Sequence, residues 1–159
     1  MKKNTNISAL FCATLLVASA STSTFSQSRF SKNELSINGF RNPSVGLEYR
    51  HKQLSYHAGY YPTAFASGET TSFMKVGATA WFLPVGKKEN PSSFYAGASY
   101  LRGFNRDYEG KNALGMETGF RWMVWKGLNL RIGVIAVAAS GESLKINPTP
   151  GISYSFFFK

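Results

Sequence analysis

The residue types of a serine hydrolase occur within one short stretch of the sequence, at Glu48, Ser55 and His57. A serine hydroxyl becomes an effective nucleophile when a base accepts its proton and a third group orients that base. If His51-Lys52 is a two-residue turn between strands, Glu48 lies opposite Ser55 and all three side chains share one face of the hairpin. The stretch predicts either a hydrolytic site or a group of buried polar side chains that hydrogen-bond to one another, as buried polar groups normally do.

Other catalytic and ligand-binding signatures are missing from the sequence. It has no phosphate-binding glycine motif, no paired cysteine or histidine ligands and no nucleophile elbow. A zinc site would need both histidines and a carboxylate, yet His51 falls in the predicted turn and His57 well inside a strand. We therefore expect neither a metal nor an organic cofactor.

The elements that must position these residues are β-strands, because apolar residues alternate with small or polar residues along most of the chain. No stretch has a helical period of apolar residues. The eight predicted strands cover about residues 34–40, 44–50, 53–63, 71–83, 93–103, 112–124, 128–138 and 149–158. Eight strands of this length predict an all-β fold, an antiparallel up-and-down transmembrane β-barrel whose interior is just filled by side chains.

The links between these strands alternate in length. At one end they cover residues 41–43, 64–70, 104–111 and 140–148, and at the other end residues 51–52, 84–92 and 125–127. Transmembrane barrels alternate longer external loops with short periplasmic turns. The first set is therefore predicted to be external, with 41–43 unusually short, and the second set periplasmic, with 84–92 unusually long.

The two faces of the predicted strands differ in chemistry. One face is apolar between the strand ends, and the other carries polar or charged residues separated by glycines. The charged residues of the polar face include Glu48, Arg50, Lys75, Glu117, Arg121 and Arg131. Glycine weakens a solvent-exposed strand, but inside a narrow barrel it leaves room for an arginine or lysine side chain from across the lumen. We therefore expect the polar face to line the lumen.

The charges of such a lumen must be paired, because an unpaired buried charge costs several kcal/mol. We expect Glu48 and Glu117 to pair with the inward lysine and arginines. The inward cations outnumber the anions, so some cations are expected to reach water near the rims. A β-sandwich would instead bury the apolar face, and it does not account for the glycines.

The first 26 residues have the features of a bacterial secretory signal peptide. Two lysines precede an apolar run over residues 7–20, and small residues at the end of the run form a cleavage pattern. Cleavage is predicted after Ala20 or near Ser26, which leaves residues 27–159 as the barrel. The only cysteine lies in the apolar run, so the mature chain would form no disulfide.

The formal net charge is +10, from 18 Lys and Arg against 8 Asp and Glu. A nucleic-acid-binding protein gathers its cations on one patch or helix, whereas these cations are scattered, so we expect no nucleic-acid partner. Several lysines fall at the predicted periplasmic rim, where either contact with lipid headgroups or simple solvation explains them. They are Lys52, Lys87, Lys88, Lys126 and Lys159.

The last predicted strand carries Ile152, Tyr154, Phe156 and Phe158 on one face. Together with the signal peptide and the eight alternating strands, this ending resembles the small eight-stranded outer-membrane barrels of Gram-negative bacteria. Known members end on the aromatic residue itself, whereas here Lys159 follows it. The resemblance implies a monomer that the barrel-assembly machinery inserts into the outer membrane, in contact with outer-membrane lipid and lipopolysaccharide.

The first predicted function is a non-catalytic barrel that acts structurally or binds an unknown extracellular partner. It would act through loops 64–70, 104–111 and 140–148, because eight strands leave no continuous aqueous path through the lumen. Loop 104–111 mixes aromatic and charged residues, which is the composition of an adaptable contact surface. The residues of this predicted contact surface are Phe104, Arg106, Asp107, Tyr108 and Glu109.

The second predicted function is hydrolysis of a lipid. Some outer-membrane lipid A deacylases are barrels of this size that use Ser, His and Glu, which would correspond to Ser55, His57 and Glu48. Their order is His-x-Ser, whereas this chain has Ser55-Tyr56-His57, and the predicted faces direct the group into the lumen. The third prediction is a soluble periplasmic β-barrel that binds a small ligand.

Overall fold

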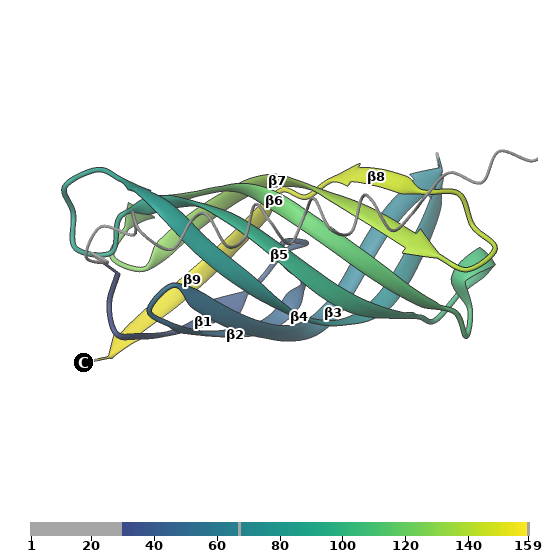
Figure 1. The fold of residues 1–159 in the computed structure, drawn as a ribbon, viewed down its shortest axis with the longest axis horizontal. Coiled ribbons are helices and arrows are strands. Elements are labelled where there is room, and N and C mark those ends of the chain that lie inside the picture. The colour runs from purple at the N-terminus through teal and green to yellow at the C-terminus, as the bar shows by residue number, and fades with distance from the viewer. Residues whose placement is uncertain (1–29, 67, 159) are drawn as a thin grey trace, which may run out of the picture.

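The computed structural model describes residues 30–66 and 68–158, and most of these residues belong to antiparallel strands (Figure 1). The strands are β1 (Asn33–Asn38), β2 (Val45–His51), β3 (Leu54–Ala66), β4 (Glu69–Val85), β5 (Ser92–Gly103), β6 (Asn112–Trp125), β7 (Leu128–Ala139), β8 (Lys145–Pro148) and β9 (Gly151–Phe158). A short 3₁₀ helix, η1 (Arg106–Tyr108), follows β5. The predicted signal peptide, residues 1–26, and Lys159 lie outside the described residues. In the described part, no helix is long and apolar enough to span a membrane.

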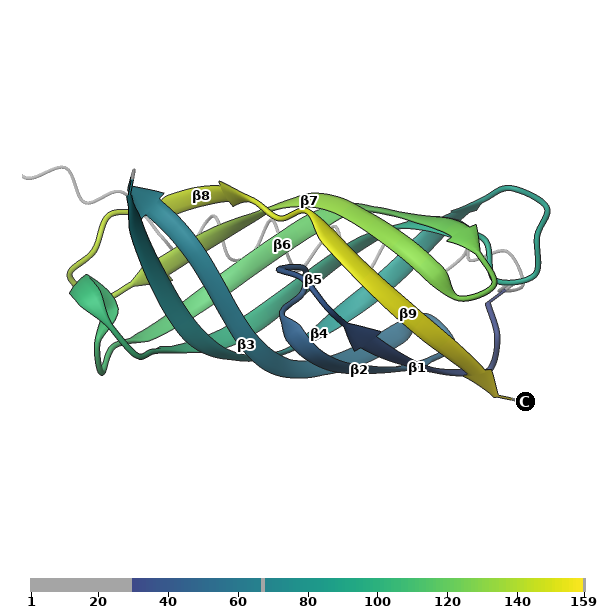
Figure 2. The same ribbon diagram turned by 180° about the vertical axis from the view of Figure 1, so that it is seen from behind.

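The strands close into a ring of eight. Each strand from β1 to β6 pairs with the next along the chain, and β9 closes the ring by pairing with both β1 and β7 (Figure 1, Figure 2). β8 also pairs with β7, so β8 and β9 together form the eighth stave, interrupted at Thr149 and Pro150. The predicted closed, antiparallel, eight-stranded fold is confirmed, and a two-sheet sandwich is excluded.

The last stave begins earlier than predicted, at Lys145 and not at residue 149. The predicted external loop 140–148 is therefore reduced to residues 140–144. The physical reason is that the segment alternates like the other strands, with Ile146 exposed and Asn147 half-buried, and its backbone groups pair with β7.

The predicted external loop 64–70 is also mostly strand. β3 continues to Ala66 and β4 starts at Glu69, so only residues 67 and 68 separate them. Thr63 lies opposite Thr71 and Ala64 opposite Thr70 in the register of this hairpin. Threonine is favoured on a pleated surface, and these residues extend the ladder beyond the apolar part of the strands.

The first hairpin turns one residue later than predicted. Its turn residues are Lys52 and Gln53, and Lys52 has a φ of 54°, in the left-handed region that tight hairpin turns use. Every pair across β2 and β3 is therefore shifted, so that Glu48 lies opposite His57 and not opposite Ser55. A turn of two residues can sit at either position in the sequence, and the pairing of the remaining strands selects one of them.

The wall of the barrel differs in height around the ring. β1 and β2 have 6 and 7 residues, whereas β3 and β4 have 13 and 17. The β1–β2 hairpin consequently ends near the middle of the barrel. Beyond its tip along the long axis, β3 and β8 lie side by side (Figure 2). Asn147 bridges these two edges, since its Nδ2 donates to the Thr63 hydroxyl and, at 3.2 Å, to the Ala64 carbonyl.

The two ends of the barrel differ in the links that they hold, and they are named the terminal end and the loop end. The terminal end holds the start of β1, the end of β9 and the links 52–53, 86–91 and 126–127. The loop end holds the links 67–68, 104–111 and 140–144. The two ends lie at opposite extremes of the long axis in Figure 1.

The polarity of this fold is inverted relative to a water-soluble core. Among the described residues, buried polar and charged side chains outnumber buried apolar ones, while large apolar side chains are exposed around the outer wall. Leu114, Met116 and Ile132 are 66–69% exposed, whereas Lys75 and Arg121 are fully buried. The predicted faces are therefore in place, with the polar face lining the interior.

Candidate functional site

The terminal half of the interior contains a cluster of buried charges, called here the ion network. Its anions are Glu34, Glu48 and Glu117, and its cations are Arg50, Lys75, Arg121 and Arg131. These residues come from β1, β2, β4, β6 and β7, and none of them is more than 4% exposed. Three carboxylates and four cations leave the cluster with one excess positive charge when His57 is neutral.

Glu34 of β1 holds two arginines. Its Oε2 accepts hydrogen bonds from Nε of Arg50 at 2.9 Å and from Nη2 of the same guanidinium, while its Oε1 accepts from Arg121 Nη1 at 2.7 Å. The Ser36 hydroxyl also donates to Oε1, at 3.1 Å. The sequence analysis missed Glu34, although Glu34 and Ser36 alternate with Leu35 and the exposed Ile37, which was the signal that could have found it.

Glu48 of β2 is the centre of the second group. Arg131 Nη1 donates to its Oε2 and the Ser55 hydroxyl donates to its Oε1, both at 2.6 Å. The Trp81 indole in turn donates to Ser55 Oγ at 2.8 Å. This chain of bonds fixes the serine oxygen between an indole and a carboxylate.

Glu117 of β6 is the centre of the third group, nearest the middle of the barrel. Lys75 Nζ donates to its Oε2 and also, at 2.8 Å, to the Pro43 carbonyl oxygen. The His57 ring lies 3.8 Å from Glu117 Oε1, and its Nε2 contacts the Ser99 hydroxyl at 3.3 Å. Glu48 and Glu117 thus each pair with a cation of the predicted set.

Trp81 lies between the Glu34 and Glu48 groups and connects them. The Arg121 guanidinium lies 4.3 Å from the centre of its ring, and that of Arg131 lies 5.1 Å away. A cation against an aromatic face gains about 0.5–2 kcal/mol, depending on how well it is desolvated. All four cations of the ion network are buried. The expectation that some of them reach water near the rims is therefore wrong. Each cation lies beside a carboxylate and an aromatic ring, which keep it away from water.

The glycines of the barrel wall leave room for side chains other than the arginines and lysines that were predicted. Gly119 and Gly133 face each other across β6 and β7, and a Cβ on either would lie 2.5 or 2.4 Å from the Tyr95 hydroxyl. A Cβ on Gly77 would lie 2.8 Å from His57 Nε2. The space is therefore used by a tyrosine and a histidine of the interior, and not by arginine or lysine.

The hydrolase residues are all in the interior, but they do not form a nucleophile and base. Ser55 is fully buried and gives its hydrogen bond to Glu48. His57 contacts Ser99 and, at 3.5 Å, Thr79, and within the described residues no hydrogen bond joins Ser55 to His57. Ser55 and His57 lie two positions apart on β3, and their side chains take different partners, since Ser55 bonds to Glu48 and the Trp81 indole while His57 contacts Ser99 and Thr79.

The two histidines are far from forming a metal site. His51 is exposed at the terminal end, where its Nδ1 contacts Asn33 Oδ1 at 2.9 Å, while His57 lies inside the barrel. Residues 30–66 and 68–158 contain no group of three or more His, Cys, Asp and Glu side chains that could hold a metal ion.

The loop half of the interior contains a cluster of buried apolar side chains that was not predicted from the sequence. We call this cluster the apolar plug, and its buried members are Tyr61, Phe73, Leu101, Tyr108, Ala113, Ile135 and Val137. Tyr108 of η1 folds into the mouth, with its ring 5.2 Å from Phe73 and 5.3 Å from Phe65. The signal was available in Leu101, Ile135 and Val137, which interrupt the polar face with bulky apolar residues near the loop end.

The predicted contact surface on loop 104–111 is only partly available. Tyr108 is 3% exposed, so it belongs to the apolar plug and not to the surface. Burial raises the pKa of its phenol, and the carboxylates of Glu142 and Asp107 raise it further. Phe104 is 51% exposed and stacks on Tyr60 with ring centres 6.4 Å apart.

The charged members of that surface face solvent. Asp107 and Glu109 are exposed, and Arg106 lies 4.0 Å from Glu69 of β4 in an exposed ion pair. Such pairs contribute little to stability, so these side chains are free to reorient toward a partner.

Comparison with known proteins identifies no relative of this chain. No protein-family model, curated protein or solved structure matches the chain. The function must therefore be argued from the barrel, its interior and its outer surface.

Proposed function

We propose that this protein is an outer-membrane β-barrel of a Gram-negative bacterium that acts without catalysis, as a structural or surface-interaction protein with a filled lumen. Residues 1–26 serve as its signal peptide in this proposal. The observation that carries it is the inverted polarity of the closed ring, with buried ion pairs inside and large apolar side chains exposed outside. A closed ring pairs the backbone groups of its strands with one another, which is what a strand-built protein needs in lipid. Toward the loop end, where β1 and β2 are short, the Asn147 side chain bridges the edges of β3 and β8.

The height of the apolar belt supports a bilayer as its surroundings. On β4 the outward residues are apolar from Met74 to Phe82, a span of nine residues. The eight steps from the first to the last of these residues, at about 3.4 Å each, cover about 27 Å along the strand. A strand tilt of about 40° reduces this to about 21 Å, close to the apolar band of about 25 Å in known outer-membrane barrels.

Aromatic side chains border this apolar belt on its terminal-end side and on its loop-end side. Trp122, Trp125, Phe156 and Phe158 are exposed toward the terminal end, and Tyr60, Tyr100 and Phe104 toward the loop end. Amphipathic rings favour the two membrane interfaces. Beyond Tyr100 the outer wall turns polar, with Arg102 and Tyr100 both donating to Asn112 Oδ1.

The interior supports a role without conduction or transport. The ion network lies in the terminal half and the apolar plug in the loop half, and these buried side chains favour a lumen without an aqueous path. What is left for function is the outer wall and the loop end. The exposed Phe104, Arg106, Asp107 and Glu109 are the part of the loop end suited to bind an extracellular partner.

Fractionation of cells that produce the protein tests the membrane proposal. We expect it in the outer membrane, resistant to extraction by alkaline carbonate, and we expect unheated samples to migrate faster than boiled ones on SDS gels. The faster migration follows because detergent without heat does not open a closed, hydrogen-bonded ring. Recovery in the soluble periplasmic fraction would refute the proposal and favour a soluble ligand-binding barrel.

A second measurement tests the filled lumen. Purified protein added to planar lipid bilayers should give no stepwise conductance, because charged pairs and aromatic rings occupy the interior. Discrete, reproducible channel openings from a homogeneous sample would contradict the non-conducting role while leaving the membrane location intact.

A further inference from the structure

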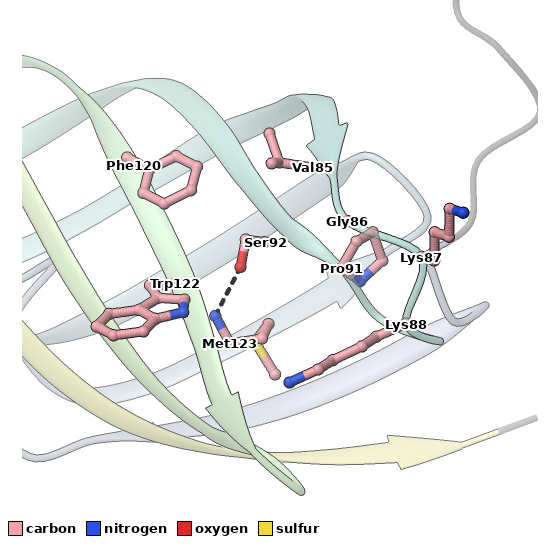
Figure 3. A pocket seen from close by; sticks show the side chains of 9 residues that line it. All are labelled: Val85, Gly86, Lys87, Lys88, Pro91, Ser92, Phe120, Trp122 and Met123. Carbon is pink, nitrogen blue, oxygen red and sulfur yellow. Dashed lines mark hydrogen bonds between the residues drawn. The ribbon is translucent and has the colours of Figure 1, made fainter.

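The outer wall carries a pocket at the terminal end whose chemistry changes along its length. It has a volume of about 410 Å³ and lies between the β4–β5 link and the end of β6 (Figure 3). Lys87 and Lys88 form its rim, while Phe120, Trp122 and Met123 form its apolar side. A site with one basic end and one apolar end fits an amphiphile with an anionic head.

The apolar side continues along the wall. Phe120 and Trp122 also line a second groove of about 450 Å³, which runs between β6, β7 and β9 toward Phe40 and Ile152. Its other lining residues are largely apolar, including Leu130 and Ile132. The two grooves share Phe120 and Trp122, so an acyl chain that starts at the basic rim contacts an apolar surface that both grooves have in common.

The charge at the rim is available to a ligand. Within the described residues, neither Lys87 nor Lys88 makes a salt bridge or a side-chain hydrogen bond. In Figure 3 the Lys88 side chain extends along the pocket with its amine toward Met123, whereas Lys87 points away from β6. The neighbouring pocket at the terminal end is also lined by Lys126 and by one anion, Glu89. The two pockets together are therefore lined by three lysines and a single carboxylate.

We infer that this groove is a specific site for an anionic diacyl phospholipid, with the lipid phosphate at Lys88 and an acyl chain against Phe120 and Trp122. The inference rests on the proposed membrane location, which places the terminal end in the periplasmic leaflet. The phosphate supplies a counter-charge for Lys88, which has no salt-bridge partner among residues 30–66 and 68–158. A basic residue near a membrane surface attracts anionic lipid by about 1 kcal/mol, which is about a fivefold change in affinity.

Tryptophan fluorescence gives a direct test, because Trp122 lines both grooves. Trp81 is buried in the interior and Trp125 is exposed nearby, so the variant Trp125→Phe makes Trp122 the main lipid-facing reporter. This protein is reconstituted in phosphatidylcholine nanodiscs that contain increasing fractions of phosphatidylglycerol with brominated acyl chains. Brominated phosphatidylcholine at the same fractions is the reference for non-selective contact.

We expect brominated phosphatidylglycerol to quench at several-fold lower mole fraction than brominated phosphatidylcholine. In the same background, Lys88→Gln should weaken this preference about fivefold. Lys52→Gln is the matched control, since Lys52 lies at the same end on the β2–β3 turn, and it should leave the preference unchanged. Equal quenching by the two lipids, or a preference that Lys88→Gln does not reduce, would overturn the site.

The outcomes separate this inference from the proposed function. Protein that is quenched equally by both lipids is inserted in the bilayer, so only the selective site fails. Protein that is quenched by neither lipid, and that shows no heat-dependent migration, is not in the bilayer, and then the membrane proposal itself fails.

Discussion

Replacing Glu34 by glutamine should be the most damaging single change in the ion network. The substitution keeps the shape of the side chain but removes the charge that holds both Arg50 and Arg121. All three side chains are at most 2% exposed, so neither arginine can turn to water. Removing one partner of a buried pair destabilises a protein by about 3–5 kcal/mol, because it leaves an uncompensated buried charge. With two arginines affected, we expect Glu34→Gln to reach at least this range.

Reversible urea unfolding in lipid vesicles measures this loss, with tryptophan emission as the signal because Trp81 stacks on Arg121. The matched control is Glu142→Gln, which breaks the half-exposed pair with Lys111 and should cost about 0–1 kcal/mol. If Glu34→Gln lowers the free energy of unfolding by no more than the control does, the interior is hydrated and the argument from buried pairing fails.

Three further predictions concern the apolar plug and the serine. Tyr108→Ala should lower the free energy of unfolding by about 3 kcal/mol, because it removes a buried ring from the plug, and Phe104→Ala on the same loop should cost far less. Ser55→Ala should cost about 1–3 kcal/mol in the same assay, since Glu48 loses a donor and the Trp81 indole loses its acceptor. Neither the native protein nor Ser55→Ala should release fatty acid from lipid A. Fatty-acid release by the native protein that is lost in Ser55→Ala would restore the hydrolase hypothesis.

The strands and their faces were predictable because both depend on local sequence. Side chains alternate across a strand with a period of two, so a run such as Ser44 to Arg50 shows its inward residues without knowledge of its neighbours. The same rule correctly directed Glu48, Ser55 and His57 inward. It did not reveal that residues 145–148 and most of the predicted loop 64–70 belong to strands.

The partners within the interior were not predictable to the same degree. A two-residue difference in the register of β2 and β3 placed His57, and not Ser55, opposite Glu48, and the sequence allows the turn at either position. The loop end shows the same limitation, because the composition of loop 104–111 does not reveal that Tyr108 turns back into the barrel. Which side chains meet inside a ring depends on how all eight strands are staggered.

The number of staves, the polarity of each face and the excess of inward cations over anions follow from the amino-acid sequence. Only the tertiary structure decided that Glu34 holds two arginines, that the Ser36 hydroxyl meets Ser155 at 2.8 Å across the closing seam, and that an apolar plug fills the loop half. Alternation is a property of neighbouring residues, whereas these contacts join residues on different strands. The Ser36–Ser155 contact joins positions 119 residues apart and exists only once the first and last strands have paired.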